Sequence, residues 1–376
     1  MAGIYIHIPF CKQKCIYCDF YSVGAIHKID DYIIALTQEL ALRKKELNDE
    51  IIRTLYIGGG TPSVLSITQL DNLINRIKRE ICFSYIDEFT IEVNPDDITI
   101  EYAKGLKSLG INRVSMGIQS FNDKELGILK RRHTAKQAIE AIKVLKDAEL
   151  SNISIDLIYG LPGQSIITWE DNVNQALKLD VSHISAYGLS YEEGTQLYRM
   201  RANGEINECS EDDYIEMYNI LVRNLKAFEY EHYEISNFAK RGKYSMHNSS
   251  YWNNTHYIGL GTAAHSYDGI ARRYNPNNIN KYIETLDKGM VYYEQVDENR
   301  YERYNDCIMT RLRTMWGLNI DVIKQEFGND LYQYCVEAMK KYIKNGEIIK
   351  DGSIVHLSDK GVMTSDNIFR ELFYVP

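Results

Sequence analysis

Short apolar segments alternate with helical patterns through the first half of the chain. The apolar segments, rich in β-branched and aromatic residues, occupy residues 3–9, 52–60, 87–94, 113–119, 153–160 and 182–190. Between them, residues 28–46, 66–80, 99–109, 134–149 and 168–179 show the apolar spacing of amphipathic helices. Strands that alternate with helices in this way predict an α/β fold with six parallel strands.

The pattern changes after residue 190. Residues 190–297 are irregular, with a helix expected near 211–229 and a polar, aromatic segment from Tyr233 to Tyr267. Loops this long tend to be functional or to cover a site. From about residue 299, helices continue to 345 and are followed by two short strands around Asp351 and Gly352. This last part resembles a small winged-helix unit.

Composition narrows the class of protein. With 376 residues and 44% hydrophobic content, the chain is long enough for one large domain and a smaller one. Its formal net charge of −9 gives no basic field for a phosphate backbone, so we expect no nucleic-acid partner. The first ten residues lack the features of a signal peptide, and no apolar run is long enough to span a bilayer. We therefore expect a cytoplasmic protein.

Polar residues gather where the predicted strands end. They are Gly58 to Thr61, Glu92, Asn94, Gln119, Asp156 and Tyr187. In parallel βα sheets and barrels, the carboxyl ends of the strands meet at the edge where sites are built. We therefore expect these residues to face one site.

Three cysteines, Cys11, Cys15 and Cys18, follow the first strand in the stretch "HIPFCKQKCIYCDF". A C-x3-C-x2-C spacing on one short loop lets all three thiolates reach a single metal centre, and thiolates select zinc, copper(I) or iron–sulfur clusters. Structural zinc takes four ligands, and the nearest candidate for the fourth is His7. A [4Fe–4S] cluster held by three thiolates instead leaves one iron open. A third reading is three unrelated thiols in a loop.

The other four cysteines, Cys82, Cys209, Cys307 and Cys335, are scattered singly along the chain. This spacing does not resemble a disulfide framework. We expect them to be ordinary buried thiols.

The three clustered cysteines match the motif of the radical S-adenosylmethionine (SAM) superfamily. In that superfamily the open iron chelates the amino and carboxylate groups of SAM, and the reduced cluster converts SAM to methionine and a 5′-deoxyadenosyl radical. The resemblance implies two cofactors, a [4Fe–4S] cluster bound by Cys11, Cys15 and Cys18, and SAM.

Two further motifs support the resemblance. "GGGTPS" at 58–63 would by itself be a tight βα turn, but beside the cysteine loop it resembles the glycine-rich motif that contacts the SAM amino group. Glu92 in "IEVNPDD" ends the third strand, where a carboxylate can accept hydrogen bonds from a ribose or an ammonium group. The alternative is a helix-capping acid, for which Asp96 and Asp97 are better placed.

Gln119, Arg131 and Asp156 follow in the chain order of the HemN/HemW branch of the superfamily. That resemblance implies that Tyr5 and Glu92 contact cluster-bound SAM. It also implies that Gly60, Thr61, Gln119, Arg131 and Asp156 belong to the SAM pocket or to a second SAM site beside it.

The same resemblance implies an incomplete (βα)6 barrel of the TIM type over residues 1–235, with the cluster and SAM at its C-terminal mouth. A connecting region would follow over 236–298, and a helical, winged-helix-like domain over 299–376.

Within the branch, the coproporphyrinogen III oxidases have a fourth cysteine two residues after the third and a long N-terminal extension. Here the corresponding residue is Phe20, and only ten residues precede Cys11. In both respects the chain resembles the haem chaperones of the branch. Those proteins also carry an H-N-x-x-Y-W signature, which is present here as "HNSSYW" at 247–252.

Within that signature, His247 is a candidate ligand of haem iron, and Tyr251 and Trp252 could stack on the porphyrin. The alternative for His247 is a histidine that orders its loop by hydrogen bonds. His256 and His265 are lesser candidates for the haem ligand.

The expected function is haem binding and delivery to haem-dependent proteins; the alternative is oxidative decarboxylation of coproporphyrinogen III propionates. A third hypothesis is a zinc-stabilised binding protein without redox chemistry. No residue is assigned a catalytic role, and SAM cleavage would be a regulatory or side activity. The resemblance implies haem as cargo, haem-accepting proteins such as respiratory membrane enzymes, and a low-potential electron donor such as flavodoxin or ferredoxin. A homodimer and peripheral contact with the membrane are further expectations.

Overall fold

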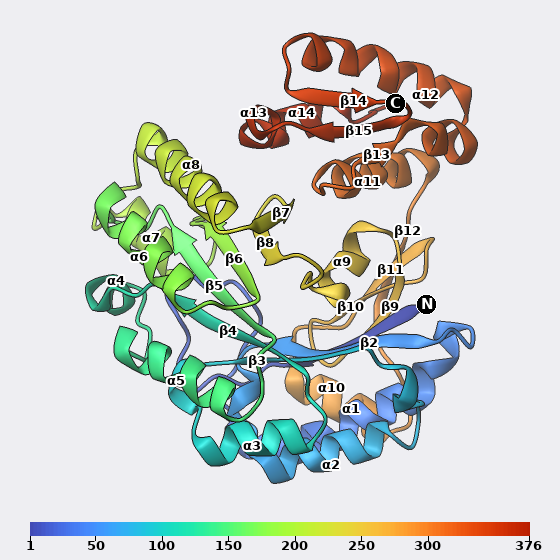
Figure 1. The fold of residues 1–376 in the computed structure, drawn as a ribbon. Coiled ribbons are helices and arrows are strands. Elements are labelled where there is room, and N and C mark those ends of the chain that lie inside the picture. Colours follow the sequence, from blue (N-terminus) through green and yellow to red (C-terminus); the bar gives the residue numbers. More distant parts are fainter.

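The computed structural model describes all 376 residues, and Figure 1 shows an α/β unit with a smaller unit at its C-terminal end. The predicted parallel strands are β1 (Ala2–Ile8), β2 (Ile52–Gly59), β3 (Glu88–Val93), β4 (Arg113–Gln119), β5 (Ile153–Tyr159) and β6 (His183–Gly188). They lie in sequence order, each parallel to the next. The six-stranded βα array expected from the sequence is confirmed.

Helices cover the outer face of this sheet (Figure 1). They are α1 (Ile29–Arg43), α2 (Ile67–Ile77), α3 (Ile100–Ser108), α5 (Ala135–Asp147), α6 (Ile166–Lys178) and α8 (Glu211–Ala227). Two short helices that the sequence pattern did not predict are α4 (Asp123–Ile128) and α7 (Gln196–Ala202). Most of these helices begin at a Ser, Thr or Asn whose side chain accepts a hydrogen bond from the first turn, as Ser66 and Thr134 do.

Both edges of the six-stranded array are extended, and the sheet does not close on itself. The hairpin of β7 (Tyr230–Glu234) and β8 (Asn237–Lys240) adds antiparallel strands beside β6. On the other edge, β9 (His256–Leu260) runs parallel to β1 and is followed by β10 (His265–Tyr267), β11 (Ala271–Tyr274) and β12 (Glu294–Asp297). The helix α10 (Ile279–Asp287) packs on α1. The barrel is therefore incomplete, as expected.

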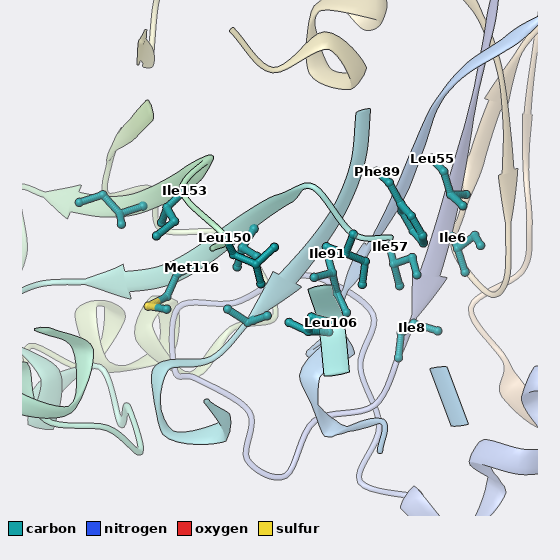
Figure 2. Packing of buried hydrophobic residues seen from close by; sticks show 14 of the residues in the cluster. Ile6, Ile8, Leu55, Ile57, Phe89, Ile91, Leu106, Met116, Leu150 and Ile153 are labelled. Carbon is teal, nitrogen blue, oxygen red and sulfur yellow. The ribbon is translucent and has the colours of Figure 1, made fainter. Parts of the chain in front are cut away.

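The strands are apolar on one face and polar on the other. Figure 2 shows part of the apolar layer, in which Ile6, Leu55, Ile91 and Met116 lie in the buried core. The alternate residues face the concave side of the sheet; they include Tyr5, Tyr56, Glu92, Arg113, Ser115, Ser154, Asp156, Ser185 and Tyr187. Barrels of the TIM type usually fill this space with branched apolar side chains. Here the interior is polar, which makes it a site rather than a core.

The C-terminal unit has its own hydrophobic core, separate from that of the α/β unit. It consists of α11 (Arg300–Leu312), α12 (Ile320–Lys344), α13 (Asp359–Met363), α14 (Ser365–Leu372) and a three-stranded sheet of β13 (Leu318–Asn319), β15 (Ile354–Leu357) and β14 (Ile348–Asp351). The two strands expected around Asp351 and Gly352 are the hairpin β14–β15. None of the chain's helices combines the length and the apolar composition that crossing a membrane requires.

The division of the chain at residues 235 and 298 stays a prediction, since strands on both sides of residue 235 belong to one sheet. Of the four scattered cysteines, Cys307 and Cys335 are buried in the C-terminal core as expected. The expectation was wrong for Cys82, which is exposed just after α2, and for Cys209, which is half-buried.

Candidate functional site

A cavity of about 480 Å³ opens at the carboxyl ends of β1 to β6. It is lined by Cys11, Cys15 and Cys18 together with Gly60, Thr61, Glu92, Gln119, Arg131 and Asp156. The structure thus brings together the three cysteines and six of the seven residues expected to bind SAM. Tyr5 and His247 do not line this cavity. The binding roles of all these residues stay predictions.

The cysteine loop is anchored at both ends. Cys11 N–H donates to Val23 O at 3.0 Å, and Val23 N–H donates to Pro9 O at 2.7 Å, which closes the base of the loop. Lys12 Nζ donates to Asp97 Oδ1 at 2.7 Å, and Asp97 also accepts a hydrogen bond from Ser63. The loop is therefore tied to the segments that follow β2 and β3. Asp96 and Asp97 were named as better candidates than Glu92 for a helix cap, but the cap of α3 is Thr99.

Two of the three thiols have polar partners on the cavity wall. Cys11 Sγ lies 3.3 Å from Thr61 Oγ1, and Arg131 Nη1 donates to Cys15 Sγ at 3.4 Å. Burial raises the pKa of Cys11, and it raises the pKa of Cys18 to about 11. No three Cys, His, Asp or Glu side chains converge closely enough to form a ready-made metal site. A [4Fe–4S] cluster does not need such convergence, because each thiolate binds a different iron, and a bound cluster would have to displace the thiol protons.

The donor set fits an iron–sulfur cluster better than zinc. The fourth zinc ligand considered from the sequence was His7, but its Nδ1 lies 3.2 Å from Tyr5 Oη and its Nε2 lies 3.1 Å from Tyr21 O. Burial also lowers the pKa of His7 to about 4. With both ring nitrogens engaged, His7 is not free to complete a tetrahedral site. Three thiols on one cavity wall instead suit a cluster that keeps one position open.

The glycines at 58–60 are required by the packing of the strands. A Cβ atom on Gly60 would lie 3.0 Å from Ile8 O and Phe10 O, and one on Gly59 would lie 2.6 Å from the His7 ring. Gly59 also has φ = 109°, which favours glycine. These glycines let the end of β2 pack against β1 and the cysteine loop. The tight-turn role is thus observed, while contact with SAM stays a prediction.

Two carboxyl groups without an ion-pair partner face the cavity. Glu92 accepts hydrogen bonds from Tyr56 Oη at 2.8 Å and from Gly59 N–H at 3.0 Å. Burial raises the pKa of Glu92 to about 7 and the pKa of Asp156 to about 6. A cationic group bound beside them would stabilise the ionised forms and lower both pKa values. The cavity is therefore electrostatically suited to a ligand with a positive centre.

Arg131 and Gln119 also line this cavity, and Arg131 lies beside Cys15. Arg131 Nη2 donates to Asn94 Oδ1 and to the carbonyl of Gly117. Gln119 ends β4 with φ = 71°, next to an irregularity in the register of β4 and β5. A left-handed conformation in a residue other than glycine is costly and tends to occur at functional sites. Gln119 is thus a candidate for ligand contact on backbone geometry as well.

His247 lies at the opposite end of the barrel interior, in α9 (Met246–Trp252). It is fully buried, with Nδ1 2.8 Å from Thr54 Oγ1 and Nε2 2.9 Å from Tyr251 Oη. Tyr5 lies beside it with its ring stacked at a centroid distance of 6.3 Å. These contacts match the alternative role of His247, a histidine that orders its loop by hydrogen bonds. To bind haem iron, His247 would have to give up one of the two hydrogen bonds.

Three further haem candidates, Trp252, His256 and His265, do not line the cavity that contains the cysteines. Trp252 lies under the guanidinium of Arg313 in the C-terminal unit. His256 is bonded to Glu50, and His265 stacks on Tyr274 in the edge strands. The glycine-rich turn near His265 approaches a flat group of the chain itself. This group is the phenol of Tyr32, because a Cβ atom on Gly261 would lie 2.3 Å from Tyr32 Oη.

Sequence analysis missed a second cavity of about 250 Å³ deeper in the barrel. It is lined by Arg113, Ser115, Ser154, Ser185, Asn248 and Tyr251 in addition to Tyr5, Tyr56, Glu92, Asp156 and Tyr187. The signal was present in the sequence as alternating polar residues in "RVSMG", "ISIDL" and "HISAY". We considered only the ends of these strands.

The comparisons with known proteins agree with this geometry. Residues 5–176 match the Radical SAM superfamily, and residues 299–364 match the HemN C-terminal domain. The chain is 35% identical over 373 residues to the heme chaperone HemW of Bacillus subtilis, covering 98% of each chain. It is 34% identical to the heme chaperone HemW of Lactococcus lactis, over 98% of this chain and 96% of that one.

Among solved structures, the coproporphyrinogen III oxidase HemN of Escherichia coli, described as a radical SAM enzyme, superposes with a TM-score of 0.85. It covers 99% of this chain and 90% of its own, at 21% identity, and so shows a shared fold. The identities to the HemW proteins extend over nearly the whole chain, from the cysteine loop to the C-terminal unit. This chain therefore belongs to the HemW family of the radical SAM superfamily.

Proposed function

We propose that this protein is a haem chaperone, which binds haem and delivers it to haem-dependent proteins. The observation that carries the proposal is the 35% identity over 98% of the chain to a curated heme chaperone HemW. The similarity to the oxidase HemN, at 21% identity, is one of fold.

Phe20 provides a second argument at the level of a single residue. It lies two positions after Cys18, lines the cavity and is 63% exposed. The oxidases of the branch have a cysteine at this position. An exposed phenyl ring offers a flat apolar ligand a contact surface and offers a metal no ligand.

Within this proposal, Cys11, Cys15 and Cys18 hold a [4Fe–4S] cluster, whose open iron chelates SAM. When bound, the cluster supplies an electron for cleavage of SAM. Gly60, Thr61, Gln119 and Arg131 form the walls of the SAM pocket, and Glu92 and Asp156 supply negative charge beside it. Tyr5 lies behind Glu92 in the deeper cavity and acts on SAM through the Tyr5–Tyr56–Glu92 cluster.

The test uses the full-length protein, reconstituted anaerobically with iron and sulfide. Haem is titrated and followed by its absorbance, and the loaded protein is mixed with an apo haem protein. In parallel, the protein is incubated with coproporphyrinogen III, SAM and a reductant. We expect stable haem binding, transfer to the acceptor and no protoporphyrinogen IX. Decarboxylation without haem binding would instead identify an oxidase.

We further propose that an acidic low-potential protein such as flavodoxin or ferredoxin reduces the cluster. The exposed side chains of Lys14 and Lys130 line the cavity, as does Phe20. They give the rim of the cavity a local positive charge, although the net charge of the whole chain is −9. Charge complementarity of this kind speeds encounter. Bleaching of cluster absorbance by reduced flavodoxin should slow at high salt and in a Lys14→Gln, Lys130→Gln double variant. An unchanged rate would contradict this docking surface.

The acceptors would be haem proteins, including respiratory enzymes that this protein meets at the cytoplasmic face of the membrane. A homodimer is part of the same proposal. Sedimentation of the reconstituted protein with and without haem tests the dimer, and co-flotation with anionic vesicles tests the membrane contact.

A further inference from the structure

The deeper cavity differs in character from the cavity that the cysteines line. It lies inside the barrel between the strands and α9, and its walls are hydroxyl, phenol, amide, guanidinium and carboxyl groups. It adjoins the outer cavity, because Glu92, Ser115, Asp156 and Tyr187 line both. A ligand in the outer cavity therefore has a polar chamber immediately beneath it.

Arg113 is the only cationic side chain that lines this chamber, and its guanidinium is not part of an ion pair. It is 1% exposed, yet its Nε and Nη1 atoms have no hydrogen-bond partner. None of the chain's ion pairs includes it, in contrast to Arg43, an equally buried arginine that pairs with Glu39. Burying a guanidinium without a partner costs several kcal/mol. A protein that retains such a group is expected to use it.

The neighbouring carboxyl groups compensate Arg113 only in part: its charge lowers the pKa of Glu92 and of Asp156, but neither carboxyl pairs with the guanidinium. Glu92 is engaged by Tyr56 and by Gly59 N–H. Burial raises the pKa of Glu92 to about 7 and that of Asp156 to about 6, so both hold a proton part of the time near neutral pH. Since neither carboxyl group pairs with the guanidinium, its Nε and Nη1 donors stay available to a ligand. The remaining groups around the chamber, such as Ser115 and Asn248, are neutral hydrogen-bonding side chains.

The size of the chamber limits what can enter. Its volume of about 250 Å³ is below the roughly 300–1,000 Å³ of pockets that enclose a whole drug-sized ligand. The chamber is thus suited to a short arm of a larger molecule or to a small free anion. A carboxylate matches the planar, two-pronged donor geometry of a guanidinium.

We propose that the deeper chamber binds an aliphatic carboxylate, with Arg113 as its ion-pair partner. Two sources supply this chemistry: the propionate arm of haem that enters the outer cavity in place of SAM, and a free small carboxylate. The first source rests on the proposed haem-chaperone function; the carboxylate site itself does not.

The test compares the reconstituted wild-type protein with Arg113→Gln, Arg113→Lys and the control Arg53→Gln. Arg53 is also a strand arginine, but its side chain is 38% exposed and pairs with Asp87. Iron and sulfide content and the thermal unfolding profile establish that each variant is folded and loaded. Arg113→Lys keeps the charge and should recover part of the binding if Arg113→Gln loses it.

Three ligands are titrated: haem, haem dimethyl ester, in which the propionates are blocked, and sodium propionate. If the haem arm occupies the chamber, Arg113→Gln weakens haem binding about 10- to 100-fold, as expected for loss of a charge-assisted hydrogen bond. Binding of the dimethyl ester should then be unchanged. If a free carboxylate is the occupant, Arg113→Gln abolishes the stabilisation of the protein by sodium propionate and leaves haem binding unchanged.

The two proposals fail separately in this experiment. Wild-type protein that binds sodium propionate through Arg113 but does not bind haem retains the carboxylate site and loses the chaperone function. Equal haem affinity of the wild type and of Arg113→Gln, together with no stabilisation of the wild type by sodium propionate, overturns the carboxylate site. Equal weakening of haem and its dimethyl ester also overturns it, since the guanidinium would then act through the structure alone.

Discussion

At the scale of single residues, the interior of the barrel holds titratable groups away from their ordinary protonation states. Glu92, Asp156 and His7 all have a pKa displaced toward the neutral form, and burial is the largest cause in each case. Such displacement is typical of functional sites, where a ligand later supplies the missing charge. The cost of holding these groups without a ligand should be measurable as a dependence of stability on pH.

We predict that Glu92→Gln raises the free energy of unfolding at alkaline pH, when the protein is prepared without cofactors. Folding raises the pKa of Glu92 from 4.5 to about 7. Protonation of Glu92 therefore contributes its full share of the free energy of unfolding below about pH 4.5, and this share is lost as pH rises through about 7. Glutamine stays neutral, so the variant should exceed the wild type by about 1–3 kcal/mol at pH 8 and match it at pH 4.5. Urea unfolding at both pH values measures this difference, with the exposed Glu140→Gln as control. A constant difference across pH would contradict the displaced pKa.

The cysteine loop gives a second prediction at this scale. Cys15 is half-buried and lies outside the hydrophobic core, and its Sγ accepts a hydrogen bond from Arg131. Cys15→Ser should lose cluster iron and acid-labile sulfide, because a hydroxyl replaces one of three thiolate ligands. The free energy of unfolding of the unreconstituted protein should change by less than about 1 kcal/mol. Cys82→Ser, at an exposed and distant cysteine, should retain full iron. Retention of the cluster by Cys15→Ser would mean that another residue ligates it.

At the scale of elements, α9 carries the "HNSSYW" signature and closes the inner end of the barrel. Ser245 caps the helix, and Glu88 of β3 accepts hydrogen bonds from the N–H groups of Met246 and His247. A carboxylate at a helix N-terminus is favourable because it meets the free N–H groups and the positive end of the helix dipole. Asn248 and Tyr251 of this helix line the deeper chamber. The helix that carries the signature is therefore bound to β3 and forms the floor of that chamber.

This arrangement predicts that His247→Ala destabilises the protein even when no haem is present. The substitution leaves Thr54 and Tyr251 without their hydrogen-bond partner and opens a hole beside Gly3. A loss of about 2–4 kcal/mol is expected from these two effects together. Denaturant unfolding of the haem-free protein is the measurement, and the exposed His27→Ala should change stability by less than about 0.5 kcal/mol. Unaltered stability would favour a ligand role over the ordering of the loop.

At the scale of the whole molecule, the α/β unit and the C-terminal unit meet at a small polar and aromatic contact. Arg313, which follows α11, pairs with Glu234 of β7 at 2.8 Å and lies over the ring of Trp252 in α9. Arg311 donates to the carbonyl of Asn253. The helix that forms the floor of the chamber, α9, is thus in direct contact with the C-terminal unit.

We predict that Arg313→Gln weakens this contact. Glu234 is 1% exposed at its side chain, so removing the cation leaves a buried carboxylate supported only by Asn237 and the Ser236 N–H. The expected loss is about 1–3 kcal/mol in the free energy of unfolding, with faster proteolysis between the two units. Lys340→Gln, which removes an exposed ion pair within α12, is the matched control and should have little effect. Equal proteolysis of the two variants would contradict the link.

The alternation of apolar and polar positions by itself determined much of this protein. It placed β1 to β6 and the principal helices correctly, because each strand buries one face and each helix one stripe, and both leave a local period in the chain. The resemblance of the cysteine, glycine and acidic motifs identified the family, since those residues lie within short stretches whose spacing is visible without the fold.

Only the tertiary structure decided what lies together across the chain. It closed the inner end of the barrel with α9, far along the sequence, and so enclosed Arg113 with Ser154 and Tyr251 in one chamber. It paired His7 with Tyr21 and His247 with Thr54, which leaves neither ring nitrogen of either histidine unbonded. These contacts depend on the register and curvature of strands separated by dozens of residues. No local pattern encodes them, because a polar residue on a strand looks the same whether it faces solvent or an enclosed chamber.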